Sequence, residues 1–338
     1  MDTRQSYLAA YRGTTVLVTG GSGAIGSNLC RALSELGAKV LVIDDLSSAD
    51  PVNLEGIKNC ALRVGSILDH EALTEAFSHR PKIVFHLAAL FANQKSVEHP
   101  ERDLMVNGVG TLRVLQLAGL VGAERLVFAS SSSLVSAPQP DMPIDEECAS
   151  LDLHTPYQVT KLLGELYCNY FHKLHKLPTV RLRFFNSYGP GEMPGRYRNV
   201  IPNFIYSALR GQPLRITGTG EETRDWTYVG DIVDGLLRVG VKEEAIGDLF
   251  NLGAGKETRV VDLARMINEI TGNDAGIVLG ERRAWDKASR RWASLDKAKR
   301  ILGYEPHTDL ATGLVTTVEW FKKNWDHIQE RAAVEMKG

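Results

Sequence analysis

Short apolar runs alternate with helical patterns along the first half of the chain. Each run is rich in β-branched residues, and apolar positions recur with helical spacing in the segment that follows it. Apolar strands separated by helices are typical of a parallel sheet covered on both faces, so we expect an α/β fold with a doubly wound parallel sheet. The pattern predicts strands over residues 14–18, 39–43, 61–64, 83–87, 125–129 and 180–183, and helices over 26–36, 104–121 and 156–174.

The pattern changes after Asn186, where residues 188–198 form a loop-rich stretch of glycine, proline and arginine. Beyond this stretch, the sequence predicts helices over 200–210 and 260–271, strands over 214–217 and 249–252, and two short helices near the end. We therefore expect a large domain over 1–185, to which 230–272 returns, and a smaller C-terminal α/β lobe over 186–229 and 273–330.

The composition is that of an ordinary soluble globular chain, with 43% hydrophobic and 24% charged residues among 338. A net charge of −2 provides no basic field for nucleic acid or for an anionic membrane surface. No apolar run approaches membrane-spanning length, so no membrane partner is expected. The cysteines are scattered without a C-x-x-C pair, which indicates reduced thiols in a cytoplasmic protein rather than a zinc site or a disulfide framework.

Glycines occupy the junction between the first predicted strand and the first predicted helix. Gly20, Gly23 and Gly26 follow one another at intervals of three residues. Glycines at such a junction permit a tight turn and a close approach of the backbone to a pyrophosphate, which rests on the helix N-terminus. A tight turn alone would use the same residues, but the strand–loop–helix setting favours a Rossmann-type dinucleotide site.

Asp44 ends the next predicted strand, about eighteen residues beyond Gly26, where the dinucleotide fingerprint places an acidic residue. A carboxylate there accepts hydrogen bonds from a ribose diol and repels a 2′-phosphate. Asp45 follows and no arginine is adjacent, so the sequence favours NAD over NADP. A turn at the end of a strand is the alternative explanation for this aspartate.

Tyr157 and Lys161 stand four residues apart in a predicted helix, which places both side chains on one face. A free tyrosine has a pKa near ~10, and a neighbouring cation lowers that pKa by stabilising the phenolate. A tyrosine tuned in this way can remove a proton from a sugar or alcohol hydroxyl. Thr155 can cap the helix, and Pro156 suits its first position. Taken alone, this short pattern fits a solvated helix face better than a catalytic pair.

Four serines, residues 130–133, close another predicted strand. A hydroxyl at the carboxyl end of a parallel strand points into the crevice where ligands bind. A serine run by itself usually marks a loop. Here one of the serines could hydrogen-bond the reacting hydroxyl and share its proton with Tyr157.

The combined pattern resembles the extended short-chain dehydrogenase/reductase family, in its branch of sugar-nucleotide epimerases and dehydratases, and is similar to that of UDP-glucose 4-epimerase-like enzymes. The resemblance spans nearly the whole chain and follows the order of the family's motifs. It rests on TGGSGAIG (19–26), IDDLS (43–47), FHLAAL (85–90), SVEHP (96–100), NGVGTL (107–112), SSSS (130–133), YQVTK (157–161), RFFNSYGPG (183–191) and TRDWTYVGDI (223–232).

The resemblance implies roles for individual residues. Tyr157 would be the base, Lys161 its electrostatic partner and a ligand of the nicotinamide ribose, and Ser132 the catalytic hydroxyl, flanked by Ser131 and Ser133. A tightly bound NAD+ would lie against Gly20, Gly23, Ala24, Ile25, Gly26, Asp44, Ser66, Ile67, Leu87, Ala88, Ala89, Asn107, Tyr157 and Lys161. A nucleotide sugar would contact Ser132, Ser133, Asn186, Asn199, Arg224, Arg283 and Asp286. A solvated surface is the alternative for the arginine-rich segment 282–291.

Residues beside Ser132 discriminate between the reactions of this family. The 4,6-dehydratases carry an Asp-Glu pair after the catalytic hydroxyl and the decarboxylases a nearby glutamate, whereas this chain has Ser133 and Leu134. The resemblance therefore implies NAD-dependent C4 epimerisation of a nucleotide sugar, with a UDP-hexose, UDP-N-acetylhexosamine or UDP-uronate as substrate. The alternatives are a dehydratase, decarboxylase or reductase on the same scaffold, and a non-catalytic NAD-binding regulatory protein.

The chain departs from the family pattern beside the substrate pocket. Ser136-Ala137 replaces the usual Tyr-Gly before a proline-containing loop, and Thr217 stands where an aromatic residue often lies. A non-standard sugar is therefore compatible with the sequence. The family's members commonly dimerise through two long helices, so the resemblance implies a homodimer formed by segments near 100–118 and 156–174.

Overall fold

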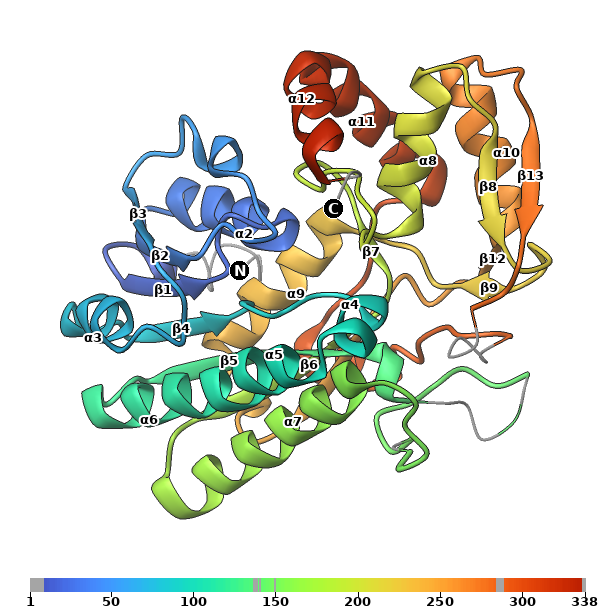
Figure 1. Cartoon of the computed structure of the whole chain (residues 1–338). Coiled ribbons are helices and arrows are strands. Elements are labelled where there is room, and N and C mark those ends of the chain that lie inside the picture. Colours follow the sequence, from blue (N-terminus) through green and yellow to red (C-terminus); the bar gives the residue numbers. More distant parts are fainter. Residues whose placement is uncertain (1–8, 136–138, 140, 149, 284–288, 336–338) are drawn as a thin grey trace.

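A seven-stranded parallel sheet forms the centre of the protein, in the order β11-β6-β5-β4-β1-β2-β3 (Figure 1). The computed structural model describes residues 9–135, 139, 141–148, 150–283 and 289–335. The strands are β1 (Thr15–Thr19), β2 (Lys39–Asp44), β3 (Cys60–Val64), β4 (Ile83–His86), β5 (Arg125–Ser131), β6 (Thr179–Phe184) and β11 (Leu249–Leu252). The expected α/β fold with a doubly wound parallel sheet is confirmed.

Side chains alternate between the two faces of the sheet, and both faces are covered, which explains why its inner strands carry apolar residues on both faces. In β1, Val16 and Val18 enter the core shared with α2 and α9, whereas Leu17 enters the opposite core with α3, α6 and α7. Helices therefore cover both faces (Figure 1). These helices are α2 (Ala24–Glu35), α3 (His70–Ser78), α6 (Thr111–Val121), α7 (Pro156–His175) and α9 (Val229–Val241).

The helix predicted over 104–121 is longer and less regular. It starts as α5 (Pro100–Asp103), passes through a π-helical segment, η2 (Leu104–Gly110), and continues as α6. Short π-helical segments are frequent at functional sites. By length and composition, the helix Pro100–Val121 is apolar enough to cross a membrane, which corrects the expectation that no run approaches that length. One side of the helix packs on α7 and in the core, while 39% of its apolar window is buried.

A second core lies in the C-terminal half of the chain, where α10 packs against α8 and α11. β11 and α9 belong instead to the central sheet and its covering layer, so the chain crosses between the two parts. The division at residues 185, 230 and 272 stays a prediction. The elements of this half include α8 (Val200–Leu209), α10 (Val260–Thr271), α11 (Leu310–Lys323), α12 (Trp325–Glu335), β7 (Ser187–Tyr188), β8 (Leu214–Thr217), β9 (Thr223–Arg224), β10 (Thr227–Tyr228), β12 (Thr258–Arg259) and β13 (Ile277–Gly280). Short helical segments are η1 (Pro51–Leu54), α4 (Asn93–Glu98), η3 (Ser132–Leu134), η4 (Glu243–Ala245) and η5 (Ala298–Leu302).

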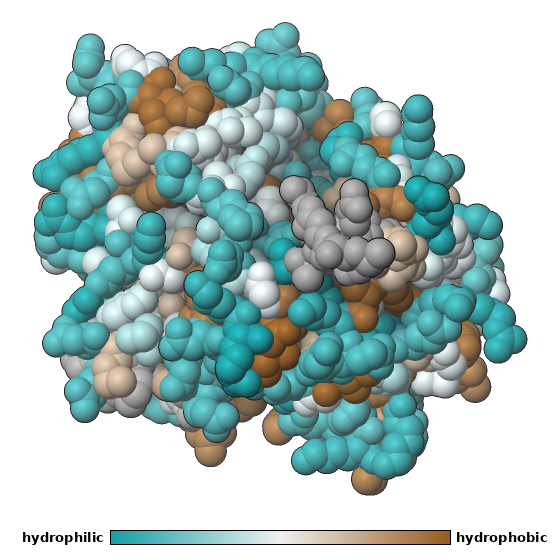
Figure 2. All heavy atoms as spheres, turned by 180° about the vertical axis from the view of Figure 1, so that it is seen from behind, coloured by the Kyte–Doolittle hydropathy of each residue, from teal (hydrophilic) through white to brown (hydrophobic). Residues whose placement is uncertain are grey.

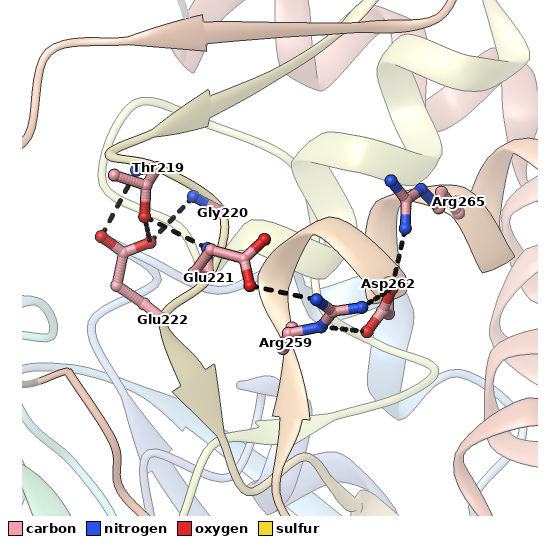
Figure 3. A network of polar contacts seen from close by, with 7 residues as sticks. All are labelled: Thr219, Gly220, Glu221, Glu222, Arg259, Asp262 and Arg265. Carbon is pink, nitrogen blue, oxygen red and sulfur yellow. Dashed lines mark hydrogen bonds and ion pairs between the residues drawn. The ribbon is translucent and has the colours of Figure 1, made fainter.

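Charged side chains tie the β9–β12 pair to the turn before it and to α10 (Figure 3). Glu222 accepts a hydrogen bond from the Thr219 hydroxyl at 3.3 Å and so closes the turn. Arg259, at the end of β12, pairs with Glu221 on that turn and with Asp262 in the first turn of α10. Such largely exposed pairs contribute only about 0–1 kcal/mol each, so they order this segment more than they stabilise the fold.

Candidate active site

A cavity of about 360 Å³ lies at the carboxyl ends of the central strands. In a doubly wound sheet, this is the place where ligands bind. The cavity brings together residues from distant segments of the chain. Among the residues proposed from the sequence, those that line it are Gly20, Gly23, Ala24, Ile25, Gly26, Asp44, Ser66, Ile67, Leu87, Ala88, Ala89, Ser132, Ser133, Tyr157, Lys161, Asn186, Asn199 and Arg283.

Of the proposed residues that the structure describes, two are not part of this lining. Asn107 is buried, and its side-chain amide bonds to the Leu90 backbone. Arg224 is largely buried, and its guanidinium donates to the Thr223 carbonyl oxygen at 2.8 Å. Asp286 lies outside the described residues, as do Ser136, Ala137, Pro138 and Pro140 of the loop after the serines.

The glycine loop fits the pyrophosphate of a dinucleotide. Gly20 has a φ of +74°, and a Cβ on it would lie 2.6 Å from the Ala88 backbone nitrogen. A Cβ on Gly26 would lie 2.3 Å from the Gly20 carbonyl oxygen, so neither position accepts a side chain. Helix α2 begins after Gly23 without a side-chain cap. The backbone N–H groups of its first turn are therefore available to an anion.

Asp44 holds the loop after β2 against the glycine loop. Its carboxylate accepts the Ser22 N–H at 2.9 Å and the Leu46 N–H at 3.0 Å. Burial raises the pKa of this carboxyl, and the two backbone N–H groups act in the opposite direction. The carboxylate also lines the cavity, so the cavity contains a fixed acceptor for a ribose hydroxyl.

Tyr157 and Lys161 are both buried, and both line the cavity. Helix α7 begins as predicted, with a side-chain cap from Thr155 and with Pro156 at its first position. The Lys161 ammonium donates to the Ala129 carbonyl oxygen at 2.8 Å, and its nitrogen lies 5.6 Å from the centre of the Tyr157 ring. The helix thus presents a phenol and a cation side by side to the cavity.

Burial dominates the protonation of this pair. It raises the pKa of Tyr157 well above its usual value, although a hydrogen bond with the Ser131 side chain acts in the opposite direction. It also lowers the pKa of Lys161 to about 8. The spacing predicts a lowered tyrosine pKa, but here burial raises it and the charge of Asp103 acts in the same direction.

The serines at the end of β5 take different partners. The Ser130 hydroxyl donates to the buried Glu165 at 2.5 Å, and the Ser131 hydroxyl donates to Ser133 at 2.9 Å. The Ser131 side chain also acts to lower the pKa of Tyr157 and lines the cavity, whereas Ser132, which the motif favours, begins the short helix η3 and lines the cavity. Ser131 is therefore a second candidate for the hydroxyl that shares a proton with the tyrosine.

Several cavity residues were missed in the sequence. Glu192, Tyr197 and Arg198 come from the loop over 188–198, and Arg102 comes from α5. Burial raises the pKa of Glu192 to about 7, against the opposing charge of Arg198. The glycine, proline and arginine content marks the loop, but the side chains that turn inward depend on its path over the sheet.

Residues 16–253 match the NAD dependent epimerase/dehydratase family. Among the relatives that resemble the chain over nearly its whole length are two enzymes of nucleotide sugars. The UDP-glucose 4-epimerase of Mycolicibacterium smegmatis is 33% identical over 309 residues, which cover 90% of this chain and 98% of the relative. The UDP-N-acetyl-alpha-D-glucosaminuronate decarboxylase of Bacillus cytotoxicus is 30% identical over 316 residues, 91% of this chain and 97% of that protein.

A solved structure extends the similarity to three dimensions. An epimerase from the thermophilic pseudomurein-containing methanogen Methanothermobacter thermautotrophicus superimposes with a TM-score of 0.95 at 53% identity, over 97% of both chains. Sequence motifs, glycine loop and sheet order all agree with the matched family. The chain therefore belongs to the NAD-dependent epimerase/dehydratase family.

Proposed function

We propose that the protein is an NAD-dependent epimerase that inverts C4 of a nucleotide sugar. One observation carries this proposal: Tyr157, Lys161 and the serines after β5 line the same cavity as the glycine loop. A sugar hydroxyl bound beside the dinucleotide can therefore reach the tyrosine. The name of the Mycolicibacterium relative, a UDP-glucose 4-epimerase, supports the same reaction.

In the proposed mechanism, the side chains handle the proton and its charge. NAD+, which the glycine loop and Asp44 would hold, would supply a reversible oxidant for carbon 4, and its positive charge would oppose the effect of burial on the Tyr157 pKa. Tyr157, as phenolate, takes the proton of the C4 hydroxyl, while Ser131 or Ser132 hydrogen-bonds to the same oxygen. Lys161 stays an ammonium below about pH 8 and stabilises the phenolate. After the 4-keto sugar has rotated, Tyr157 returns the proton.

We infer that the nucleotide is a uridine diphosphate, because the names of both relatives contain UDP. Asn186, Asn199 and Arg283 line the cavity and carry amide and guanidinium donors suited to a diphosphate. Contacts of the substrate with Arg224 and Asp286 stay predictions. A non-standard sugar fits the sequence, because Ser136-Ala137 departs from the pattern of the family at a position that the resemblance places beside the substrate pocket.

Decarboxylation of a nucleotide-activated uronate is the second candidate. It is favoured by the Bacillus cytotoxicus relative and by the cavity carboxyl of Glu192, whose raised pKa of about 7 suits a proton donor. The position beside the catalytic hydroxyl argues against it, because Ser133 and the buried Leu134 stand where the decarboxylases carry their glutamate. We therefore place epimerisation first.

A substrate panel tests both candidates. UDP-galactose, UDP-N-acetylgalactosamine and UDP-galacturonate are supplied separately to the purified protein without added NAD, and the products are followed by NMR. At least one sugar should equilibrate with its C4 epimer, and Tyr157→Phe should abolish the exchange. Release of carbon dioxide in place of an epimer would establish the second candidate. No reaction with these or with other nucleotide sugars would contradict both.

We infer that the protein forms a homodimer through α6 and α7. Large apolar side chains on these helices are exposed, with Leu120 at 80%, Leu166 at 56% and Leu174 at 69% of their surface. The two helices lie side by side in the lower part of Figure 1, whereas the opposite side of the molecule in Figure 2 is mainly hydrophilic. A second copy of the chain would cover this apolar surface.

We also infer a cytoplasmic location. All four cysteines, Cys30, Cys60, Cys148 and Cys168, are free. Free thiols persist in reducing compartments, which supports the expectation from the sequence.

A further inference from the structure

A buried carboxylate near Tyr157 and Lys161 takes no part in the mechanism above. Asp103, the last residue of α5, has no exposed surface. Its carboxylate accepts a hydrogen bond from the Thr160 hydroxyl at 2.7 Å and another from the Asn107 side-chain amide at 2.7 Å. Because Thr160 precedes Lys161 on α7, this carboxylate joins the π-helical segment to the helix that carries the proton acceptor.

Asn107 fixes the carboxylate from the side of the cavity wall. Its amide oxygen accepts the Leu90 N–H at 2.8 Å, and its amide nitrogen also donates to the Leu90 carbonyl oxygen at 3.2 Å. Leu90 itself lines the cavity. The Thr111 hydroxyl closes the π-helical segment by donating to the Asn107 carbonyl oxygen at 2.6 Å. With both oxygens bonded, Asp103 is held in a single orientation.

The titratable groups around this carboxylate come from every element that packs against it. From α7 come Tyr157 and Lys161, and further along the same helix Glu165 is paired with Arg183. From β4 comes His86, which stays neutral because burial and the charge of Lys161 lower its pKa to about 3. The remaining groups lie on α4, on α5, on α6 and on His99 between α4 and α5. All of them are exposed or half-exposed: Lys95, Glu98, His99, Glu101, Arg102 and Arg113.

The charge of Asp103 acts on both members of the pair. Burial lowers the pKa of Lys161 to about 8, and the Asp103 carboxylate opposes this change. The same charge adds to burial in raising the pKa of Tyr157. The Asp103 carboxylate therefore raises both pKa values, because an anion favours the protonated form of any neighbouring group.

We propose that Asp103 is a positioning residue whose buried charge keeps Lys161 an ammonium and sets the pH range in which Tyr157 exchanges its proton with the sugar. This inference rests on the proposed function, in which Tyr157 is the proton acceptor. The two limbs of the pH profile of kcat/KM then report the proton of Tyr157 and the proton of Lys161. A neutral residue at position 103 lowers both pKa values, so both limbs move to lower pH.

The test compares the holoenzyme of the wild type with Asp103→Asn and Thr160→Val. Asp103→Asn should move both limbs of the kcat/KM profile to lower pH by about 1 unit. Burial raises the pKa of Asp103, and Thr160→Val removes one of the hydrogen bonds that oppose this. The Asn107 hydrogen bond and the charge of Lys161 remain to keep the carboxylate ionised, so the limbs of this variant should stay within experimental error of the wild type. A structural role alone would predict lowered Tm in both variants with unmoved limbs, and that result would overturn the proposal.

A second measurement needs no sugar. In holoenzyme labelled with [ε-13C]lysine, the Lys161 signal, assigned by its loss in Lys161→Arg, should titrate at lower pH in Asp103→Asn than in the wild type. An unchanged midpoint would overturn the proposal even if every sugar in the panel reacts. A lowered midpoint supports it even if none does, which separates this inference from the proposed reaction. Asp103→Ser, a smaller neutral side chain, replaces the asparagine variant if that variant does not fold, with the same expected shift.

Discussion

Glu165 and Arg183 form a buried ion pair next to the serines of the candidate site, and replacing the glutamate should destabilise the protein strongly. Their side chains are only 5% and 2% exposed. The guanidinium donates through Nε and Nη2 to the two carboxylate oxygens, each at 2.9 Å, and through Nη1 to the Glu146 carbonyl oxygen at 3.0 Å. The Ser130 hydroxyl donates to the same carboxylate, so the pair also holds the end of β5.

In Glu165→Gln, the guanidinium keeps its charge in a buried site that has lost its counter-charge. Removing one partner of a buried pair costs about 3–5 kcal/mol of the free energy of unfolding. An unfolding entropy of about 2.1 cal/mol/K per residue amounts to ~0.7 kcal/mol/K for a chain of this length. The Tm should therefore fall by about 4–7 °C.

Differential scanning calorimetry measures this difference, with Glu75→Gln as the matched control. The Glu75–Arg63 pair is 54% and 42% exposed, and such pairs contribute about 0–1 kcal/mol. The control should therefore change Tm by less than about 1.5 °C. The double variant Glu165→Leu with Arg183→Met removes both charges and should recover most of the loss. The reasoning is refuted if Glu165→Gln changes Tm no more than the control does.

Three further predictions follow from burial and contact geometry. Gly26→Ala should lower Tm and the amount of NAD that copurifies, because its Cβ would lie 2.3 Å from the Gly20 carbonyl oxygen; overpacking of this kind costs about 1–3 kcal/mol. Gly119→Ala, whose Cβ would meet nothing within 4 Å, is the control and should keep its NAD. Leu166→Arg should convert the dimer into a monomer in sedimentation velocity, whereas an arginine at the equally exposed Leu279 on β13 should not; a variant that sediments like the wild type would contradict the proposed interface. The activity of the wild type should fall above about pH 8, where the buried Lys161 loses its proton, and a profile that stays flat to pH 10 would show that the lysine charge is not required.

Local signals in the sequence predicted most of the elements. The strands over 214–217 and 249–252 and the helix over 260–271 agree with β8, β11 and α10 at both ends. Short apolar runs between turn residues and a clear helical period depend on neighbours within a few positions, so they can be recognised without the fold. The π-helical turn at Leu104–Gly110 was not predicted, because contacts of Asn107 with a distant loop support it.

The sequence by itself determined the chemistry that depends on spacing: the glycine loop, the carboxylate of Asp44, and a phenol and an ammonium on one helical face. Only the tertiary structure decided how these groups are charged and which partners they have. Burial reversed the expected shift of the Tyr157 pKa, while the Ser131 side chain acts on that pKa in the opposite direction. The fold also placed Asp103 against Thr160, 57 positions away. The reason is physical: a pKa depends on the loss of water and on nearby charges, and both come from atoms that the fold assembles from distant segments.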